Sequence, residues 1–131
     1  MPVAAPPRLL CVEDEQPLLT VLSMALTHHG FEVVKATNGI DALAQYLDHG
    51  GSFTAIITDH DMPDLNGLEF IRQARGAGFT REIFLMSGRL APSDLLAYGE
   101  LGINGFLQKP FGIDALIRLL RKTIVSEDKL V

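Results

Sequence analysis

The sequence predicts an α/β domain in which a parallel sheet carries helices on both of its faces. Five short apolar runs, rich in β-branched residues, alternate with five stretches that have the apolar spacing of amphipathic helices. Strict alternation of this kind requires right-handed crossovers, and such crossovers place neighbouring strands parallel. The chain of 131 residues is long enough to bury a complete core in one domain.

Each expected strand is a short apolar run that ends at polar residues. The third run is the most sharply bounded, because it stops at Asp59 and is followed by a turn sequence that contains Pro63, Asn66 and Gly67. Buried parallel strands read as such continuous apolar runs. The five expected strands cover residues 8–12, 31–36, 55–58, 82–86 and 103–107.

The expected helices lie between these strands and after the last one. Pro17 suits the first turn of the first helix and Gly30 ends it, whereas Asn38 can cap the second. The third is expected over residues 67–75, and the short fourth opens at residues 92–93 and ends by Gly99. The apolar stripes expected to face the core are Leu18, Val21, Leu22, Ala25 and Leu26 in the first helix, Ile40, Leu43, Ala44 and Leu47 in the second, and Ile113, Leu116, Ile117, Leu120 and Ile124 in the last.

Composition limits the classes of function. A net charge of -5 disfavours direct nucleic-acid binding, because phosphate contacts require clustered Lys and Arg. No run approaches the ~18 apolar residues of a membrane span, and the first residues do not resemble a signal peptide. The single Cys11 lies in an apolar run and is expected to be a buried small hydrophobe. We expect a cytoplasmic protein with a Pro/Ala tail over residues 1–7, one domain over 8–125 and a polar tail over 126–131.

Acidic and polar side chains follow several of the expected strands directly. The carboxyl ends of parallel strands share one edge of the sheet, so these side chains are expected to be neighbours in space. They comprise four carboxylates, a hydroxyl and an ammonium group: Glu13, Asp14, Asp59, Asp61, Ser87 and Lys109.

This set of groups favours magnesium-dependent phosphoryl chemistry. Crowded carboxylates repel one another unless a cation lies among them, and Glu13, Asp14 and Asp59 offer the hard oxygen ligands that Mg²⁺ or Mn²⁺ takes. An Asp can attack phosphorus and form an acyl phosphate, for which Lys109 would neutralise charge. Ser87 is expected either to donate a hydrogen bond to the attached phosphoryl group or to cap its own loop.

In order along the chain, these residues resemble the receiver domain of two-component response regulators. The resemblance is carried by Glu13-Asp14, by Ser87, and by two segments, Asp59-His60-Asp61-Met62-Pro63-Asp64-Leu65-Asn66-Gly67 and Lys109-Pro110-Phe111; it extends over about residues 8–125. It implies a flavodoxin-like sheet of order 2-1-3-4-5. It further implies a signalling domain, not a turnover enzyme, that takes a phosphoryl group from a histidine kinase or a histidine phosphotransfer protein.

The same resemblance implies roles for individual residues. Asp59 would be the phosphoacceptor, and the backbone carbonyl of Asp61 would join the three carboxylates around Mg²⁺. Lys109 would bind the phosphoryl group, while Ser87 and Phe106 would be the switch pair. The face made by the fourth helix, fifth strand and fifth helix would then bind an unidentified downstream protein, or a second copy in a homodimer.

Three further interpretations follow from individual residues. Asp61 and Arg89 are expected either to form an ion pair that gates the hydrolytic water or to be two solvated charges. His60 is expected to point away from the phosphorylation site more readily than to donate a proton there. The alternative function is a magnesium-dependent phosphatase of haloacid-dehalogenase type, which also begins its site with Asp-x-Asp. Pro63 and the lack of further acidic ligands disfavour that alternative.

Overall fold

The computed structural model describes residues 5–125, so the expected C-terminal tail at 126–131 and the first four residues of the expected N-terminal tail at 1–7 lie outside the described residues. Strands and helices alternate throughout, as predicted. The strands are β1 (Arg8–Val12), β2 (Glu32–Ala36), β3 (Ala55–Asp59), β4 (Glu82–Ser87) and β5 (Gly105–Gln108). The helices are α1 (Gln16–His28), α2 (Gly39–Asp48), α3 (Gly67–Gly76), α4 (Pro92–Glu100) and α5 (Ile113–Leu120), which the π-helical turn η1 (Arg121–Val125) continues.

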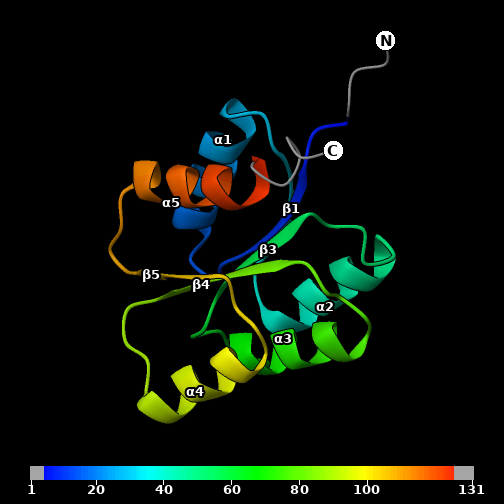
Figure 1. The fold of residues 1–131 in the computed structure, drawn as a ribbon, viewed down its shortest axis with the longest axis vertical. Coiled ribbons are helices and arrows are strands. Elements are labelled where there is room, and N and C mark those ends of the chain that lie inside the picture. Colours follow the sequence, from blue (N-terminus) through cyan, green and yellow to red (C-terminus); the bar gives the residue numbers. More distant parts are fainter. Residues whose placement is uncertain (1–4, 126–131) are drawn as a thin grey trace.

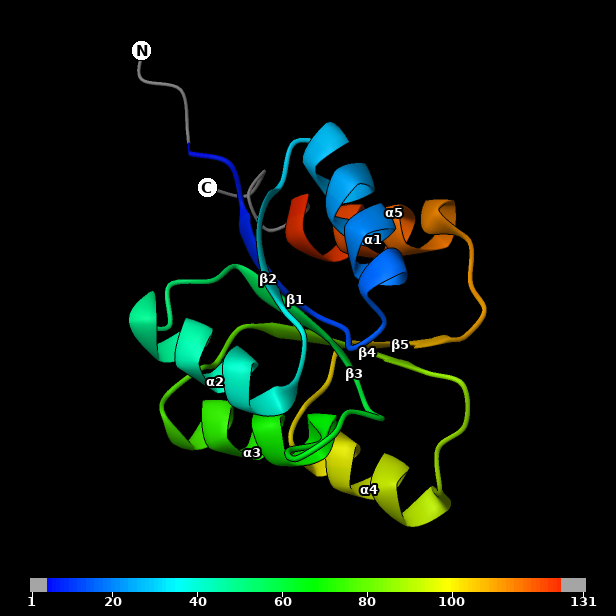
Figure 2. The same ribbon diagram turned by 180° about the vertical axis from the view of Figure 1, so that it is seen from behind.

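All four strand pairs are parallel, and the sheet has the order β2-β1-β3-β4-β5. The predicted fold class and strand order are therefore confirmed. Helices α1 and α5 cover one face of the sheet, and α2, α3 and α4 cover the other (Figures 1 and 2). Strand β3 lies at the centre of the sheet between β1 and β4, so its carboxyl end is flanked by two other strand ends.

The core is divided by the sheet into two clusters. Alternate residues of the central strands point to opposite faces, so Ile56 and Ile83 pack under α2, α3 and α4, whereas Ile57 and Phe84 pack under α1 and α5. Cys11 is fully buried in the second cluster, where burial raises the pKa of its thiol to about 12. This agrees with the prediction of an unreactive core cysteine. No helix within residues 5–125 combines the length and the apolar character that a membrane span needs.

Two of the predicted helix faces need correction. The α2 stripe was wrong by about one position, since Ile40 and Leu47 are 58% and 59% exposed, while Ala42 and Tyr46 are buried. Tyr46 stacks on Phe53 and meets Phe79 edge to face, and this aromatic contact fixes the rotation of the helix.

In α1 the outward residue is Val21, which is 51% exposed, and Leu19 takes its place in the core. The α5 stripe was correct, because Leu116, Ile117, Leu120 and Ile124 are all buried.

The last strand begins two residues later than predicted. Asn104 precedes it and acts as its boundary, because its backbone N–H donates to the carbonyl of Ile83 and its side-chain oxygen accepts from the N–H of the same residue. Within this strand Phe106 points outward and is 41% exposed. Strand β5 then ends at Gln108, directly before Lys109.

Candidate phosphorylation site

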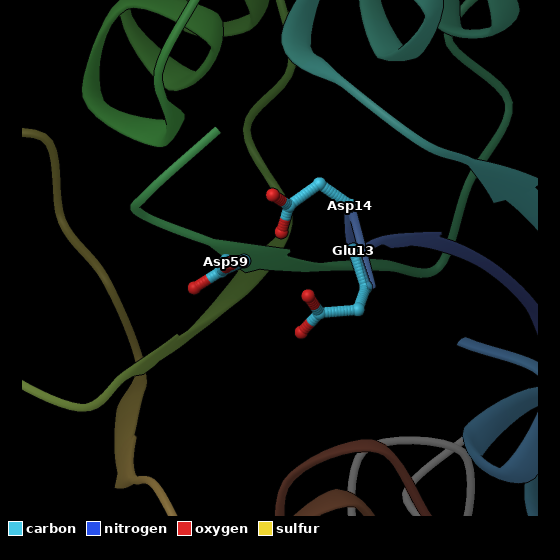
Figure 3. Close-up of side chains that lie close together, drawn as sticks. All are labelled: Glu13, Asp14 and Asp59. Atoms are coloured by element: carbon cyan, nitrogen blue, oxygen red, sulfur yellow. The ribbon is translucent and has the colours of Figure 1, made fainter. Parts of the chain in front are cut away.

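Three carboxylates meet where β1 and β3 end. Glu13 and Asp14 follow β1, and Asp59 is the last residue of β3. Each offers an oxygen that lies within 4.8 Å of the oxygens of the other two. Figure 3 shows the three side chains converging on one small region from the two strand ends. Glu13 and Asp59 are buried, whereas Asp14 is exposed, so the cluster has one side open to solvent.

Lys109 brings a positive charge to this cluster from the end of β5. Its Nζ lies 2.6 Å from Glu13 Oε1 and 3.4 Å from Asp59 Oδ2. The longer Glu13 side chain is therefore its nearer partner. Burial acts to lower the pKa of Lys109, but the hydrogen bond to Glu13 and the charge of Asp59 outweigh it and raise that pKa. The lysine therefore stays charged and holds two carboxylates at once.

The single ammonium group leaves the carboxylates only partly neutralised. Burial, followed by the charge of Glu13, raises the pKa of Asp59 to about 7, although Lys109 acts in the opposite direction. Burial also raises the pKa of Glu13. Asp59 Oδ1 is buried and has no hydrogen-bond partner among residues 5–125. An unpartnered buried carboxylate oxygen is costly, so this atom is available for a ligand.

This set of donors fits a divalent, oxygen-liganded cation. All three groups are carboxylates, which Mg²⁺ and Mn²⁺ prefer, and a cation would offset the repulsion that raises the Asp59 pKa. One Glu13 oxygen is already committed to Lys109, and Oε2 accepts a hydrogen bond from the backbone N–H of Glu15 at 3.1 Å. Among the three carboxylates, Asp14 and Asp59 are therefore the freer ligands.

Ser87 ends β4 beside Asp59 and is fully buried. Residue Asp59 pairs with Met86 in the sheet, which places Ser87 one residue beyond it. The Ser87 hydroxyl donates to the backbone carbonyl of Arg89 at 3.0 Å. The loop-capping interpretation therefore describes the hydrogen bond present here, and a bond to a phosphoryl group would require the hydroxyl to turn.

The remaining predicted residues form no ion pair with the carboxylates that is seen among residues 5–125. Asp61 and Arg89 are both exposed, and within the described part of the chain no ion pair involves either of them. Phe106 lines an open groove together with Leu95 and the loop after β4. The Lys109–Pro110 peptide bond is cis.

Sequence reasoning missed a buried polar contact next to this site. His60 follows Asp59 directly, and its Nδ1 lies 2.7 Å from the hydroxyl of Tyr98 on α4. Gly67 at the start of α3 closes the same junction, since a Cβ there would lie 2.4 Å from the Asp59 carbonyl oxygen. The prediction that His60 points away from the carboxylates was consistent with this contact, but nothing in the residue spacing identified Tyr98 as its partner.

Comparison with known proteins assigns this arrangement to a family. Residues 9–121 match the response regulator receiver domain. The chain belongs to the response regulator receiver domain family. As a receiver domain, it serves as a phosphoacceptor module of two-component signalling. The matches give no support to the alternative of a haloacid-dehalogenase-type phosphatase.

Curated relatives of this receiver domain are bacterial regulators. It is 32% identical over 126 residues to response regulator MprA of Mycobacterium sp. (strain KMS), covering 93% of this chain and 54% of the relative. It is 29% identical over 116 residues to transcriptional regulatory protein KdpE of Mycobacterium tuberculosis (strain CDC 1551 / Oshkosh), covering 88% and 50%. The chain thus spans about half the length of these relatives.

Solved structures support the same assignment. A response regulator receiver protein from Pseudomonas putida matches with a TM-score of 0.83 and 30% identity, covering 92% of this chain and 99% of that one. Vibrio cholerae chemotaxis protein CheY4 matches with a TM-score of 0.81 and 28% identity, covering 91% and 99%.

Proposed function

We propose that Asp59 is the residue that accepts the phosphoryl group. The observation that carries this proposal is the environment of its carboxylate. It is buried at the central strand end, one oxygen is 3.4 Å from Lys109, and the other has no hydrogen-bond partner among residues 5–125. A nucleophile for phosphorus needs such a free oxygen, with a cation nearby to neutralise the incoming charge.

The proposed transfer is a direct displacement at phosphorus. An oxygen of Asp59 attacks the phosphorus of a phosphohistidine on a kinase or phosphotransfer protein. The P–N bond breaks, the imidazole nitrogen keeps the electron pair, and Asp59 becomes an acyl phosphate. Lys109 would balance the added negative charge. Its ion pairs with Glu13 and Asp59 support this role, because they keep its ammonium group beside the Asp59 carboxylate.

Glu13, Asp14 and Asp59 would hold Mg²⁺ or Mn²⁺, joined by the backbone carbonyl of Asp61. Such a cation supplies charge neutralisation at the transferring phosphoryl oxygens. The chain's own contribution is to gather three oxygen ligands from two strand ends, with Glu13 fixed by Lys109 and by the Glu15 N–H.

Ser87 and Phe106 would convert phosphorylation into a change of shape. The phosphoryl group adds about 1.5 to 2 negative charges and three acceptor oxygens. The Ser87 hydroxyl would leave the Arg89 carbonyl and donate to one of these oxygens, and the loop after β4 would move with it. Phe106 would turn into the space that the loop leaves, changing the face of α4, β5 and α5 on which a downstream partner or a second copy binds.

Asp61 and Arg89 would act on the lifetime of the acyl phosphate. Both side chains are exposed and lie two residues after Asp59 and Ser87, so an ion pair formed between them over the phosphoryl group would limit the access of water. An Arg89→Ala variant should then lose its phosphoryl group faster than the wild type. An unchanged decay rate would leave the two residues as solvated charges.

The whole protein would work in the cytoplasm with a histidine kinase and a downstream target. Receiver domains interact with such kinases or with phosphotransfer proteins. A signalling role, not turnover of an external substrate, is the expectation for this chain. The domain boundaries at residues 8 and 125 also belong to this proposal.

Labelling by acetyl phosphate tests the assignment of Asp59. The wild type with Mg²⁺ should gain one phosphoryl group per chain, measured by intact mass, and Asp59→Asn should gain none. Asp64→Asn is the matched control, because it changes an exposed carboxylate of the same loop and should label like the wild type. Labelling of Asp59→Asn at the wild-type level would refute the assignment. Sustained hydrolysis of p-nitrophenyl phosphate would refute the signalling role.

A further inference from the structure

His60, Asp94 and Tyr98 form a contact between the proposed phosphorylation site and α4, which we call the α4 clamp; His60 and Tyr98 are buried, and the Asp94 side chain is 36% exposed. His60 is 8% exposed although it follows the strand end. Its Nδ1 lies 2.7 Å from the Tyr98 hydroxyl, and its Nε2 lies 3.5 Å from Asp94 Oδ2. The His60 and Tyr98 rings meet edge to face with centroids 5.5 Å apart. The residue next to the proposed phosphoacceptor is therefore bound to α4 by side-chain contacts.

The three groups are chemically matched. Burial raises the pKa of Tyr98, as does the charge of Asp94, so its hydroxyl keeps its proton, and it shares one hydrogen bond with His60 Nδ1. The other ring nitrogen faces the Asp94 carboxylate at 3.5 Å. Asp94 and Tyr98 are four residues apart on α4, so one histidine ring contacts two successive turns of the same helix face.

Tyr98 is the main buried anchor of α4. Within its range, all of which is described, no other residue is buried. Leu95 and Leu96 are 48% and 71% exposed, so they add little buried area, and Ala97 packs only partly against the core. The other contacts lie after the helix, where Leu101 packs against the core and Arg75 binds the carbonyls of Leu101 and Gly102. The α4 clamp is therefore the contact that ties α4 to the end of β3.

The main chain around the clamp is fitted to it. Gly67 donates its backbone N–H to the carbonyl of His60 at 3.0 Å. A Cβ at Gly67 would lie 2.7 Å from the Tyr98 hydroxyl oxygen and 3.0 Å from His60 Cα. The end of β3, the start of α3 and the middle of α4 thus meet with no space for one more carbon atom.

We propose that the α4 clamp holds α4 in the arrangement in which Ser87 donates to Arg89, and so sets the free-energy cost of moving α4 when Asp59 is modified. The coupling of the clamp to Asp59 rests on the proposed role of Asp59, whereas the anchoring of α4 by the clamp does not. His60 and Tyr98 are positioning residues in this scheme. The loop from Ser87 to Ala91 leads directly into α4, so displacement of that loop must move Asp94 against His60.

The first test measures α4 without any phosphoryl donor. Amide hydrogen exchange is followed in the wild type, in Tyr98→Phe, which removes one oxygen, and in His60→Phe, which keeps an aromatic ring. The α4 amides of both variants should exchange roughly three- to tenfold faster than in the wild type, relative to the α1 amides, which is the range expected for loss of one buried hydrogen bond. Tyr46→Phe is the control, because it removes the hydroxyl of another largely buried tyrosine, on α2, and should leave α4 unchanged.

The double variant decides whether the two residues act together. If one hydrogen bond links them, His60→Phe/Tyr98→Phe should accelerate α4 exchange no more than His60→Phe alone, which already removes the contacts to both Tyr98 and Asp94. Multiplied effects in the double variant would refute the clamp, and so would unchanged α4 exchange in Tyr98→Phe.

The second test connects the clamp to Asp59 through beryllofluoride, which mimics a phosphoryl group on aspartate. Tyr98→Phe should reach half-saturation at a three- to tenfold lower beryllofluoride concentration than the wild type, because less free energy is spent in moving α4. A merely structural tyrosine would leave that concentration unchanged, and an unchanged or higher value would refute the proposal. If beryllofluoride fails to bind the wild type, the role of Asp59 fails, whereas the exchange experiment still decides the clamp.

Discussion

Asp59 has an environment that suits reaction more than stability. Its carboxylate is buried, lies near two other carboxylates, and shares Lys109 with Glu13. A residue selected only for stability would be fully paired, because burial of an underpaired charge costs several kcal/mol. The repulsion among the three carboxylates would be relieved by binding of a cation or by protonation of Asp59.

Because the pKa of Asp59 is raised, the free energy of unfolding should depend on pH when a chelator keeps the site free of metal. A carboxyl group titrates near 4 in the unfolded chain and near 7 in this fold, so the folded state holds the extra proton between these values. The contribution of Asp59 to the free energy of unfolding is therefore most favourable below about pH 4 and falls as the pH rises to about 7.

The matched variant for this effect is Asp59→Asn, which cannot ionise. In EDTA it should be roughly 1–4 kcal/mol more stable than the wild type at pH 8 and nearly equal to it at pH 4, measured by urea unfolding. Burial raises the pKa of Glu13 as well, so a smaller decline should persist in the variant. A stability difference that is constant from pH 4 to pH 8 would contradict the raised pKa.

Gly67 is tightly packed against the backbone of the site. A Cβ there would meet the Asp59 carbonyl oxygen at 2.4 Å, and backbone cannot move aside as a flexible side chain can. Gly67→Ala should cost about 1–3 kcal/mol in urea unfolding and should slow phosphoryl labelling, since it displaces the end of β3. Gly76→Ala in the same helix has no atom within 4 Å of the added carbon, so it should be neutral or slightly stabilising. Equal effects at the two positions would contradict this account.

For individual residues, the sequence predicted that the charged groups lie close together, but it did not predict which of them form ion pairs. Asp14, Asp59 and Lys109 each follow a strand, and parallel strand ends meet, so their proximity followed from topology. That Lys109 lies nearer Glu13 than Asp59 depends on side-chain length and rotamer, which spacing does not contain. The contact between His60 and Tyr98 depends on the rotation of α4, which has a weak apolar stripe and exposes Leu95 and Leu96.

Among the elements, α3, β4 and α4 are joined by one side chain at the edge opposite the site. Arg75 donates to the carbonyls of Phe79 and Arg81 before β4, and to those of Leu101 and Gly102 after α4, at distances of 2.8–3.0 Å. Four backbone acceptors at element ends thus depend on one guanidinium group, which also lies over the ring of Phe79. Its planar fork explains why Arg and not Lys suits this position.

Arg75→Ala should therefore destabilise the domain by about 2–4 kcal/mol in urea unfolding, because it removes four charge-assisted hydrogen bonds, two of which are part-buried. Arg72→Ala is the control from the same helix. Arg72 is exposed and pairs with Glu69, so its loss should cost less than ~0.5 kcal/mol. If both variants lost the same small amount, the four contacts of Arg75 would not be contributing as described.

Element boundaries were predictable where capping residues marked them. Asn38 was expected to cap α2, and it does so by accepting a hydrogen bond from the N–H of Asp41. Helix α3 begins at Gly67 as expected, where Asn66 accepts from the N–H of Glu69 in the same way. Helix rotation was less predictable, as α2 shows. Its aliphatic residues alone gave the wrong face, because the aromatic cluster around Tyr46 determines which side is buried.

For the whole molecule, fold and chemistry are linked through the sheet edge. The strand order was predicted because five alternating units and the acidic strand ends together resemble one family, and alternation alone would not have distinguished between parallel sheet orders. The order β2-β1-β3-β4-β5 places β3 between β1 and β4. The cluster of carboxylates is therefore a property of the assembled sheet, and no single segment contains it.

Binding of Mg²⁺ should accordingly stabilise the entire domain. A ligand that binds only the folded state adds RT ln(1 + [L]/Kd), which is about 2.7 kcal/mol at a hundredfold excess over Kd. The free energy of unfolding of the wild type at pH 8 should thus rise with the logarithm of the Mg²⁺ concentration. Asp14→Asn should weaken this dependence strongly, because Asp14 is the exposed member of the cluster and is not committed to Lys109 in the structure.

Two comparisons make this prediction specific to the carboxylate cluster. Asp48→Asn removes an exposed carboxylate at the end of α2, so it should keep the wild-type response to Mg²⁺. Lowering the pH from 8 to 5 should reduce the response of the wild type, because a proton on Asp59, whose pKa is about 7, competes with the cation for the same oxygens. A response that is equal at both pH values, or that survives Asp14→Asn undiminished, would place the cation elsewhere on the surface.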